Sequence, residues 1–250
     1  MIQREYRDGT AILRIEHGKA NAVDLELFQE LDRHLRDLRA TPPKAVILTG
    51  SGKIFSAGVD LFRVLKNEDG YLERFLPQLS STLLGLFTLP MPVVAAVNGH
   101  AIAGGCILAL ACDHRVLAEG KASLGVSELA VGVPFPVAPL EVLRHVLTER
   151  HARDLVMTGR LVGVEEALEI RLVDETCPQD ELMDRALEAA ARLAKIPARS
   201  FALTKQLLRR PTVEQIERYT SIIDPQVLHA WEDSKIQAAI QDFLDRTVKK

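Results

Sequence analysis

The chain has 250 residues, of which 47% are hydrophobic and 26% charged, and its formal net charge at pH 7 is −3. This composition is sufficient for a large packed core and excludes wholesale disorder. Because no long basic run is present, a broad cationic face for binding nucleic acid is not expected.

The three cysteines, Cys106, Cys112 and Cys177, show neither the spacing of a metal site nor that of a redox pair. Cys106 and Cys112 lie in an apolar helix pattern, which indicates buried thiols in a reducing compartment. No charged and then apolar leader opens the chain, and no apolar run is long enough to cross a bilayer. We therefore expect a cytoplasmic protein with no metal and no membrane partner, although a targeting peptide already removed would leave no trace.

Alternating and continuous apolar runs predict strands in the first half of the chain. The expected strands cover residues 2–7 and 11–16, joined at Asp8-Gly9, and residues 45–49, 93–97, 114–118 and 122–124. Helical spacing predicts one helix capped by Asp24 and others over residues 71–89, 139–147, 150–157 and 164–170. From Pro178 the pattern is helical to the end, with breaks expected at Pro197, Pro211 and Pro225. Strands thus crowd roughly the first 130 residues and helices the last 75 or so, which favours an α/β core with a helical C-terminal extension.

Small residues follow one of these strands at the start of an apolar helix. In VVAAVNGHAIAGGCILALACD, Ala103, Gly104 and Gly105 open the helix. Backbone N–H groups at a helix start lack intrahelical partners and are electropositive, so they can hold an oxygen that becomes an anion during a reaction. The alternative is a tight turn that needs small residues only for packing.

A second stretch has the same organisation. AVILTG, followed by FSAGVDL, also runs from an apolar strand through a glycine turn and small residues into a helix. Two turns built alike can present two backbone N–H groups to one ligand atom.

Three motifs in order, KIFSAGVDL, VVAAVNGHAIAGGCILALACD and SLGVSELAVGVPFP, resemble the crotonase (enoyl-CoA hydratase/isomerase) superfamily. VEEALEIRLVDE and a C-terminal helix with Trp231 and Phe243 also fit it. The resemblance implies an α/β spiral of repeated β-β-α units over residues 1–195 and a helical oligomerisation region over residues 196–250. It also implies a homotrimer or a dimer of trimers that acts on an acyl-CoA thioester, with coenzyme A entering as part of the substrate and no other cofactor.

The resemblance further implies that the backbone N–H groups of Val59 and Gly104 hold the thioester oxygen. It also implies that residues 17–22 share the CoA-facing edge with the first of the two turns. The CoA-facing residues implied are Ser56, Ala57, Gly58, Val59, Asp60, Gly104 and Ala20. Ala103 and Arg171 stand where many members have glycine, and the first of these departures is expected to matter little because Gly104 is the donor.

Glu128, in GVSELAVG, matches the later of the two glutamates used by hydratases of this family. Its apolar neighbours, Val126, Leu129, Val131 and Val133, predict a raised pKa that suits a general base near neutral pH. The alternative for a glutamate in a loop is a solvated side chain or a helix cap.

The earlier glutamate falls at Ile107, which can neither accept nor donate a proton. Moving a double bond from C3–C4 to C2–C3 needs only one base, and GVSELAVGVPFPVAPL resembles the Δ3,Δ2-enoyl-CoA isomerase branch, in which one glutamate acts alone. Asp60, Glu141 and Asp113 are not expected to replace the missing acid.

Apolar residues beside the motifs are candidates for the wall of an acyl pocket, with core packing as the alternative for each. They are Leu61, Phe62, Val64, Leu65, Phe135 and Pro136. Lys249 and Lys250 are either contacts of a CoA phosphate or, as we favour, a solvated tail.

The favoured function is therefore an enoyl-CoA isomerase with Glu128 as its base. The first alternative is an enoyl-CoA hydratase or another enolate-forming step, such as hydrolysis or decarboxylation. The second is a catalytically silent protein that binds acyl-CoA or serves as an oligomeric scaffold. Some members of the superfamily bind RNA, but the net charge of −3 and the lack of a basic and aromatic stripe argue against that here.

Overall fold

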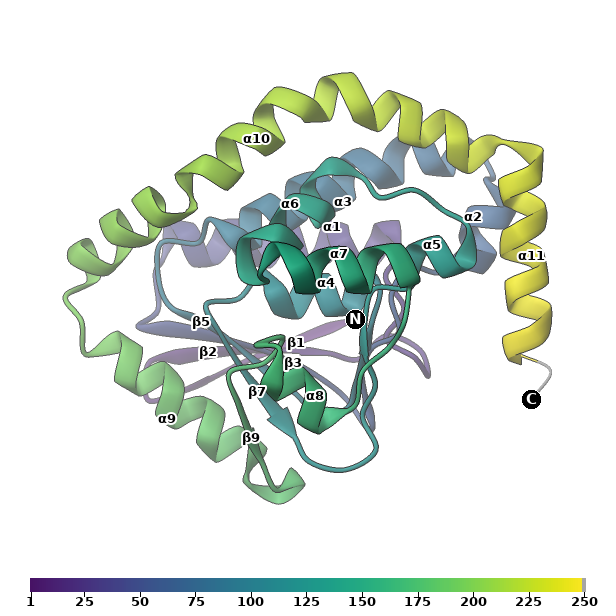
Figure 1. Ribbon diagram of the computed structural model, residues 1–250. Coiled ribbons are helices and arrows are strands. Elements are labelled where there is room, and N and C mark those ends of the chain that lie inside the picture. Colours follow the sequence, from purple (N-terminus) through teal and green to yellow (C-terminus); the bar gives the residue numbers. More distant parts are fainter. Residues whose placement is uncertain (249–250) are drawn as a thin grey trace.

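Two sheets lie beneath a layer of helices in the computed structural model, which describes residues 1–248 (Figure 1). The larger sheet has the strand order β1-β2-β3-β5-β7-β9, in which only the β1–β2 pair is antiparallel. Its strands are β1 (Ile2–Arg7), β2 (Thr10–Ile15), β3 (Ala45–Gly50), β5 (Val93–Val97), β7 (His114–Ala118) and β9 (Glu175–Cys177). The smaller sheet is parallel and contains β4 (Ile54–Ser56), β6 (His100–Ile102) and β8 (Leu124–Gly125).

From β3 onward, consecutive strands alternate between the two sheets, which produces the spiral of β-β-α units that the resemblance implies. β3, β5 and β7 pair in the larger sheet, while β4, β6 and β8, which follow them in the chain, pair in the smaller one. A helix follows each pair: α2 (Leu61–Lys66), α4 (Gly104–Leu110) and α5 (Glu128–Val131). The turns between the smaller sheet and these helices therefore lie side by side. Two turns can present N–H groups to one ligand atom only in such an arrangement.

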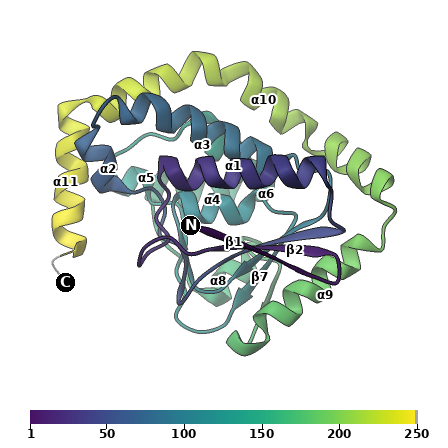
Figure 2. The ribbon, with the colours of Figure 1, turned by 180° about the vertical axis from the view of Figure 1, so that it is seen from behind.

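The remaining helices cover the sheets and close the core. They are α1 (Leu25–Ala40), α3 (Tyr71–Phe87), α6 (Val137–Val146), α7 (Glu149–Thr158), α8 (Val164–Glu169), α9 (Leu182–Ala194), α10 (Ala198–Glu232) and α11 (Ser234–Val248), with a 3₁₀ turn at Gln179–Glu181. Figures 1 and 2 show α10 arching over α1, α3 and α6 on the side away from the larger sheet. The boundary expected between residues 195 and 196 falls in the connection between α9 and α10. No helix within residues 1–248 is long and apolar enough to cross a bilayer.

The breaks predicted at Pro211 and Pro225 are wrong, because both prolines lie inside α10. A proline inside a helix costs about 3 kcal/mol, so other contacts must hold this helix together. Arg209 is buried and donates to backbone carbonyls at the ends of α3 and α4, those of Phe87 and Ala111. Trp231 is buried near the other end of the helix. The break predicted at Pro197 is correct, since that residue precedes α10 as its N-cap.

Two positions where the resemblance implies glycine have backbone conformations that favour glycine. Ala103 has φ +50° and Arg171 has φ +63°. Side chains with a Cβ reach this region at a cost of order 1–3 kcal/mol. Alanine in place of glycine at residue 103 thus strains the backbone at the turn before α4. The backbone N–H of Gly104 is still present at the start of that helix.

Gly105 lets α4 pack directly onto the end of β4. A Cβ added there would lie 2.3 Å from the carbonyl oxygen of Ser56, which no structure tolerates without a backbone shift. Gly105→Ala should therefore lower the free energy of unfolding by about 3 kcal/mol or more, measured by denaturant titration. Gly85→Ala is the matched control, because its Cβ would meet only Leu35 Cδ1 at 3.6 Å within α3. Alanine favours a helix interior, so the control should be neutral or stabilising by up to about 1 kcal/mol. Equal stability of the two variants would show that α4 is not pinned at Ser56.

Candidate active site

The turns after β4 and β6 meet at Val59 and Gly104. A Cβ added to Gly104 would lie 3.6 Å from Val59 Cγ2 and 3.9 Å from the Val59 nitrogen. A Cβ added to Gly58, which has φ +87°, would lie 3.2 Å from the Gly104 nitrogen. The two backbone nitrogens named as oxygen-binding donors are therefore neighbours, although they are 45 positions apart in the chain.

Neither of these two N–H groups has a hydrogen-bond partner within residues 1–248. Val23 donates to the Gly58 carbonyl at 2.7 Å, and Asp60 donates to the Val23 carbonyl at 2.9 Å. These two hydrogen bonds form a parallel β-bridge between Val23 and Val59. They use the carbonyl of the residue before Val59 and the N–H of the residue after it, so the N–H of Val59 itself points away from Val23. Gly104 is the first residue of α4, where no intrahelical acceptor exists for its N–H. Two unpaired donors side by side are suited to bind one oxygen as negative charge develops on it.

The turn after β4 is held by contacts with residues 17–22, which the resemblance places along the same edge. Ala57 donates its N–H to the Ala20 carbonyl at 3.0 Å. The hydroxyl of Ser56 donates to the Asn21 carbonyl at 2.7 Å and is fully buried. Asp60 accepts from the backbone at the start of α2, which agrees with the structural role expected for it. These side chains position the backbone, and the turn presents main-chain atoms to a ligand.

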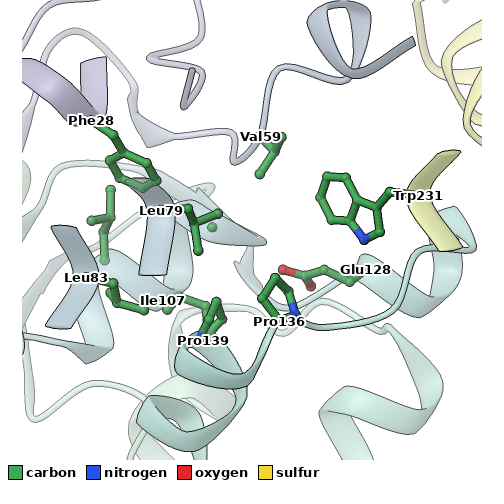
Figure 3. A pocket seen from close by; sticks show the side chains of 11 residues that line it. Phe28, Val59, Leu79, Leu83, Ile107, Glu128, Pro136, Pro139 and Trp231 are labelled. Atoms are coloured by element: carbon green, nitrogen blue, oxygen red, sulfur yellow. The ribbon is translucent and has the colours of Figure 1, made fainter. Parts of the chain in front are cut away.

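A small apolar cavity lies beside the two N–H groups, with about 30 Å³ enclosed and about 410 Å³ when the space open to solvent at its mouth is included. Helices α1, α3, α4, α6 and α10 and the two turns contribute to it (Figure 3). Its lining consists of Phe28, Val59, Leu79, Leu83, Gly104, Ile107, Leu108, Glu128, Pro136, Pro139 and Trp231. Glu128 is the one ionisable residue among them.

Glu128 stands at the first position of α5 with its carboxyl in this cavity. Its Oε2 is buried and has no hydrogen-bond partner within the described residues. Burial raises the pKa of the Glu128 carboxyl to about 7, because the charged form loses water without gaining a cation. Trp231 lies nearby in Figure 3, but its indole N–H donates to the Pro134 carbonyl at 3.0 Å. A carboxylate whose pKa lies near neutral pH, and whose Oε2 has no hydrogen-bond partner, is suited to remove a proton from a ligand.

No second acid accompanies Glu128 in the cavity lining. Ile107, where the resemblance implies the earlier glutamate, is 2% exposed and lines the cavity. Asp60 caps α2, and Glu141 forms an ion pair on the surface of α6. Asp113 lies 2.6 Å from the buried Lys205 Nζ at the far end of α4. The three alternative acids are therefore engaged elsewhere, as the sequence predicts.

The expected wall residues are placed differently by the structure. Of the six, only Pro136 lines the cavity. Leu61 packs against the core from the start of α2, Phe135 is buried in the core, and Phe62 is 53% exposed. The cavity is instead lined by core residues that sequence reasoning did not assign to a site: Phe28, Leu79, Leu83, Leu108 and Pro139. Lys249 and Lys250 lie outside the described residues.

The fold and the paired turns beside one buried carboxyl define a crotonase-type protein. A model of the enoyl-CoA hydratase/isomerase family matches residues 5–249, and the chain belongs to this family. A putative enoyl-CoA hydratase of Thermus thermophilus is 39% identical over 212 residues, which are 83% of this chain and 83% of that protein. The mitochondrial enoyl-CoA delta isomerase 1 of Mus musculus is 29% identical and covers 100% of this chain and 88% of its own length. The crystal structure of human mitochondrial Δ3,Δ2-enoyl-CoA isomerase superposes with a TM-score of 0.95 at 27% identity, covering 99% of this chain and 98% of that one.

Proposed function

We propose that this protein moves the C3–C4 double bond of an enoyl-CoA thioester to C2–C3, with Glu128 as its single acid–base group. One observation carries the proposal: the cavity lining contains one carboxyl, whose Oε2 is buried and unpartnered, and Ile107 lines the cavity where the resemblance implies a second glutamate. Hydration requires a water to be activated and a proton to be delivered to carbon, whereas a double-bond shift needs only one group that takes a proton and returns it.

The proposed reaction proceeds in two proton transfers. Glu128 removes a proton from C2, and the electron pair moves onto the thioester oxygen to form a dienolate. The N–H groups of Val59 and Gly104 stabilise that oxygen with little reorganisation, since the turns already hold them side by side. Protonated Glu128 then delivers its proton to C4, which leaves the double bond at C2–C3. The apolar side chain of Ile107 keeps water from adding to the intermediate.

The CoA portion of the substrate would run along the backbone of residues 56–60. Ser56 is buried, so the turn offers main-chain atoms of Ala57, Gly58 and Asp60 rather than side chains in this role. Ala20 lies against the same turn through its hydrogen bond with Ala57. Coenzyme A enters with the substrate, and the proposed chemistry needs no further cofactor.

Enoyl-CoA hydration is the second candidate, favoured by the 39% identity to the putative hydratase of Thermus thermophilus. In that case Glu128 alone would have to activate water. The test is to offer the purified protein 3-hexenoyl-CoA and crotonyl-CoA and to identify the products by mass spectrometry and chromatography. We expect 2-hexenoyl-CoA from the first and no 3-hydroxybutanoyl-CoA from the second. Rapid hydration without isomerisation would replace the proposal, and no turnover of either would favour a catalytically silent protein.

The rate of isomerisation should depend on pH through the Glu128 carboxyl. The base must be ionised in the free enzyme, and its pKa is raised to about 7 by burial. We expect kcat/KM to rise with pH through about 7 and to fall about tenfold per unit well below that value. Initial rates between pH 5 and 9 measure this, with substrate stability checked at each pH. A profile that is flat between pH 5 and 7 would show that another group is the base.

A further inference from the structure

The cavity beside Glu128 has a partly exposed mouth and a buried interior. Val59, Gly104 and Glu128 are partly exposed, whereas the other lining residues are all buried. An oxygen bound by the N–H groups of Val59 and Gly104 therefore sits at the mouth. The acyl chain attached to that carbonyl has only one direction left, which is inward between α1, α3, α4 and α6.

The inner end of this cavity is closed by Phe28 of α1 and by Leu79 and Leu83 of α3. Their exposed fractions are 2%, 5% and 2%. Figure 3 shows Phe28 and Leu83 on the side of the cavity opposite Glu128 and Trp231. The hydroxyl of Thr82 donates to the Phe28 carbonyl at 3.3 Å, which ties the two helices together behind this end.

Phe28 is held from behind, so it cannot easily swing aside. Its ring stacks on that of Phe75, with centroids 6.2 Å apart and planes 12° apart. Phe75 stacks in turn on Tyr71 at 5.4 Å. The Tyr71 hydroxyl accepts a hydrogen bond from the Leu25 N–H at 3.2 Å, one turn before Phe28. Interiors packed this way yield little to an added carbon atom, so the inner end acts as a fixed stop.

We infer that Phe28, with Leu79 and Leu83, sets the longest acyl chain the site accepts and restricts it to short- and medium-chain enoyl-CoA thioesters. The inference rests on the proposed function for the position of the thioester. The space of about 410 Å³ includes the solvent-open mouth, so on the order of ten chain atoms at about 30 Å³ each is an upper limit. The limit therefore lies at or below about ten carbons, and longer chains meet the ring of Phe28.

Binding of saturated acyl-CoA thioesters measures this limit without requiring turnover. Each methylene buried in an apolar pocket improves affinity about fourfold, equivalent to about 0.8 kcal/mol. Isothermal titration with butanoyl- to tetradecanoyl-CoA should show Kd falling about fourfold per carbon up to a break at or below ten carbons. Beyond the break Kd should level off or rise. The kcat/KM values of the matching 3-enoyl-CoA substrates should break at the same length.

Variants at the inner end should move the chain length at which Kd stops falling, and they should move it in opposite directions. Phe28→Ala opens space and should shift it several carbons longer, while Leu79→Phe fills space and should shift it shorter. The second variant keeps the test decisive if the first folds poorly. Leu35→Ala is the matched control, since Leu35 is buried on the same helix but outside the cavity lining, and it should leave the break unmoved.

The outcomes separate this inference from the proposed function. A break that moves as described in a protein that does not isomerise 3-enoyl-CoA supports the inference and rejects the proposed function. Isomerisation with no break up to tetradecanoyl-CoA, or a break that stays fixed in both folded variants, overturns the inference alone. Failure to bind any acyl-CoA overturns both.

Discussion

Glu128→Gln is expected to lower kcat/KM for isomerisation by about 10²–10⁴-fold while leaving the affinity for saturated acyl-CoA nearly unchanged. Glutamine has almost the same shape but cannot take a proton from C2, and positioned proton transfer contributes about 10²–10⁴ in rate. With no second acid in the cavity lining, nothing within residues 1–248 is placed to substitute. Initial rates with 3-hexenoyl-CoA and titration with hexanoyl-CoA measure the two quantities. Equal rates for the two proteins would remove Glu128 from the mechanism.

The same substitution should stabilise the protein, which guards against loss of activity through misfolding. Burial raises the pKa of Glu128 to about 7, above its ordinary value of 4.5, so ionising it costs more in the folded state than in the unfolded one. The folded state holds the extra proton, so stability falls as pH rises from about 4.5 to 7 and the penalty then stays constant. Glutamine never ionises, and Glu128→Gln should be more stable at pH 8 by up to about 3 kcal/mol. At pH 4 the gain should vanish, and a variant less stable than wild type at both pH values would contradict this account of the carboxyl.

Gly104→Pro is expected to lower kcat by about 10²–10³-fold with a retained fold. Proline has no N–H, so the substitution removes one of the two oxygen-binding donors, and loss of one such donor typically costs that much. The first position of a helix is where proline is best tolerated, and Gly104 holds that position in α4. Rates are compared after circular dichroism and thermal melting have shown a folded protein.

Gly104→Ala is the matched control for the lost donor. It keeps the N–H, and its Cβ would meet Val59 Cγ2 at an ordinary 3.6 Å. We expect it to lose less than about tenfold in kcat, so that the difference between the two variants reports the loss of the N–H together with the ring Cδ that takes its place. If both variants lose activity equally, crowding at the mouth rather than the donor explains the effect.

Most strands of the larger sheet could be predicted because their signals are local, whereas β4 and β6 of the smaller sheet are too short to be recognised and the repeated β-β-α units were implied only by the resemblance. Apolar runs end at glycine turns, and helical spacing follows at once, so neighbouring residues alone define these elements. The breaks predicted at Pro211 and Pro225 failed because contacts distant in sequence decide them. Arg209 and Trp231 anchor α10 to the core on either side of these prolines. Such anchoring outweighs the local preference of proline against a helix.

The side of the cavity that holds the proposed base and donors was predictable, and the proposed acyl side was not. Val59, Gly104 and Glu128 lie in motifs with recognisable order, and the structure brings all three to one cavity. Phe28 and Leu83 have the helical spacing of any core residue, and nothing local reveals that their ends face empty space. Leu61 and Phe135 were expected at the wall from their position beside the motifs, yet their backbone directs them into the core. Their contact with substrate stays a prediction without support from this cavity.

The most direct test of the central claim follows a deuterium label from C2 to C4. One carboxyl whose Oε2 is buried, and which takes a deuteron from C2, should return part of it to C4 before it exchanges with solvent. With 3-hexenoyl-CoA dideuterated at C2 and ordinary water as solvent, mass spectrometry and NMR should find 2-hexenoyl-CoA that carries deuterium at C4. Glu128→Gln should give none of this product. Release of 3-hydroxyhexanoyl-CoA, or a product with no deuterium at C4, would contradict a single-base double-bond shift by Glu128.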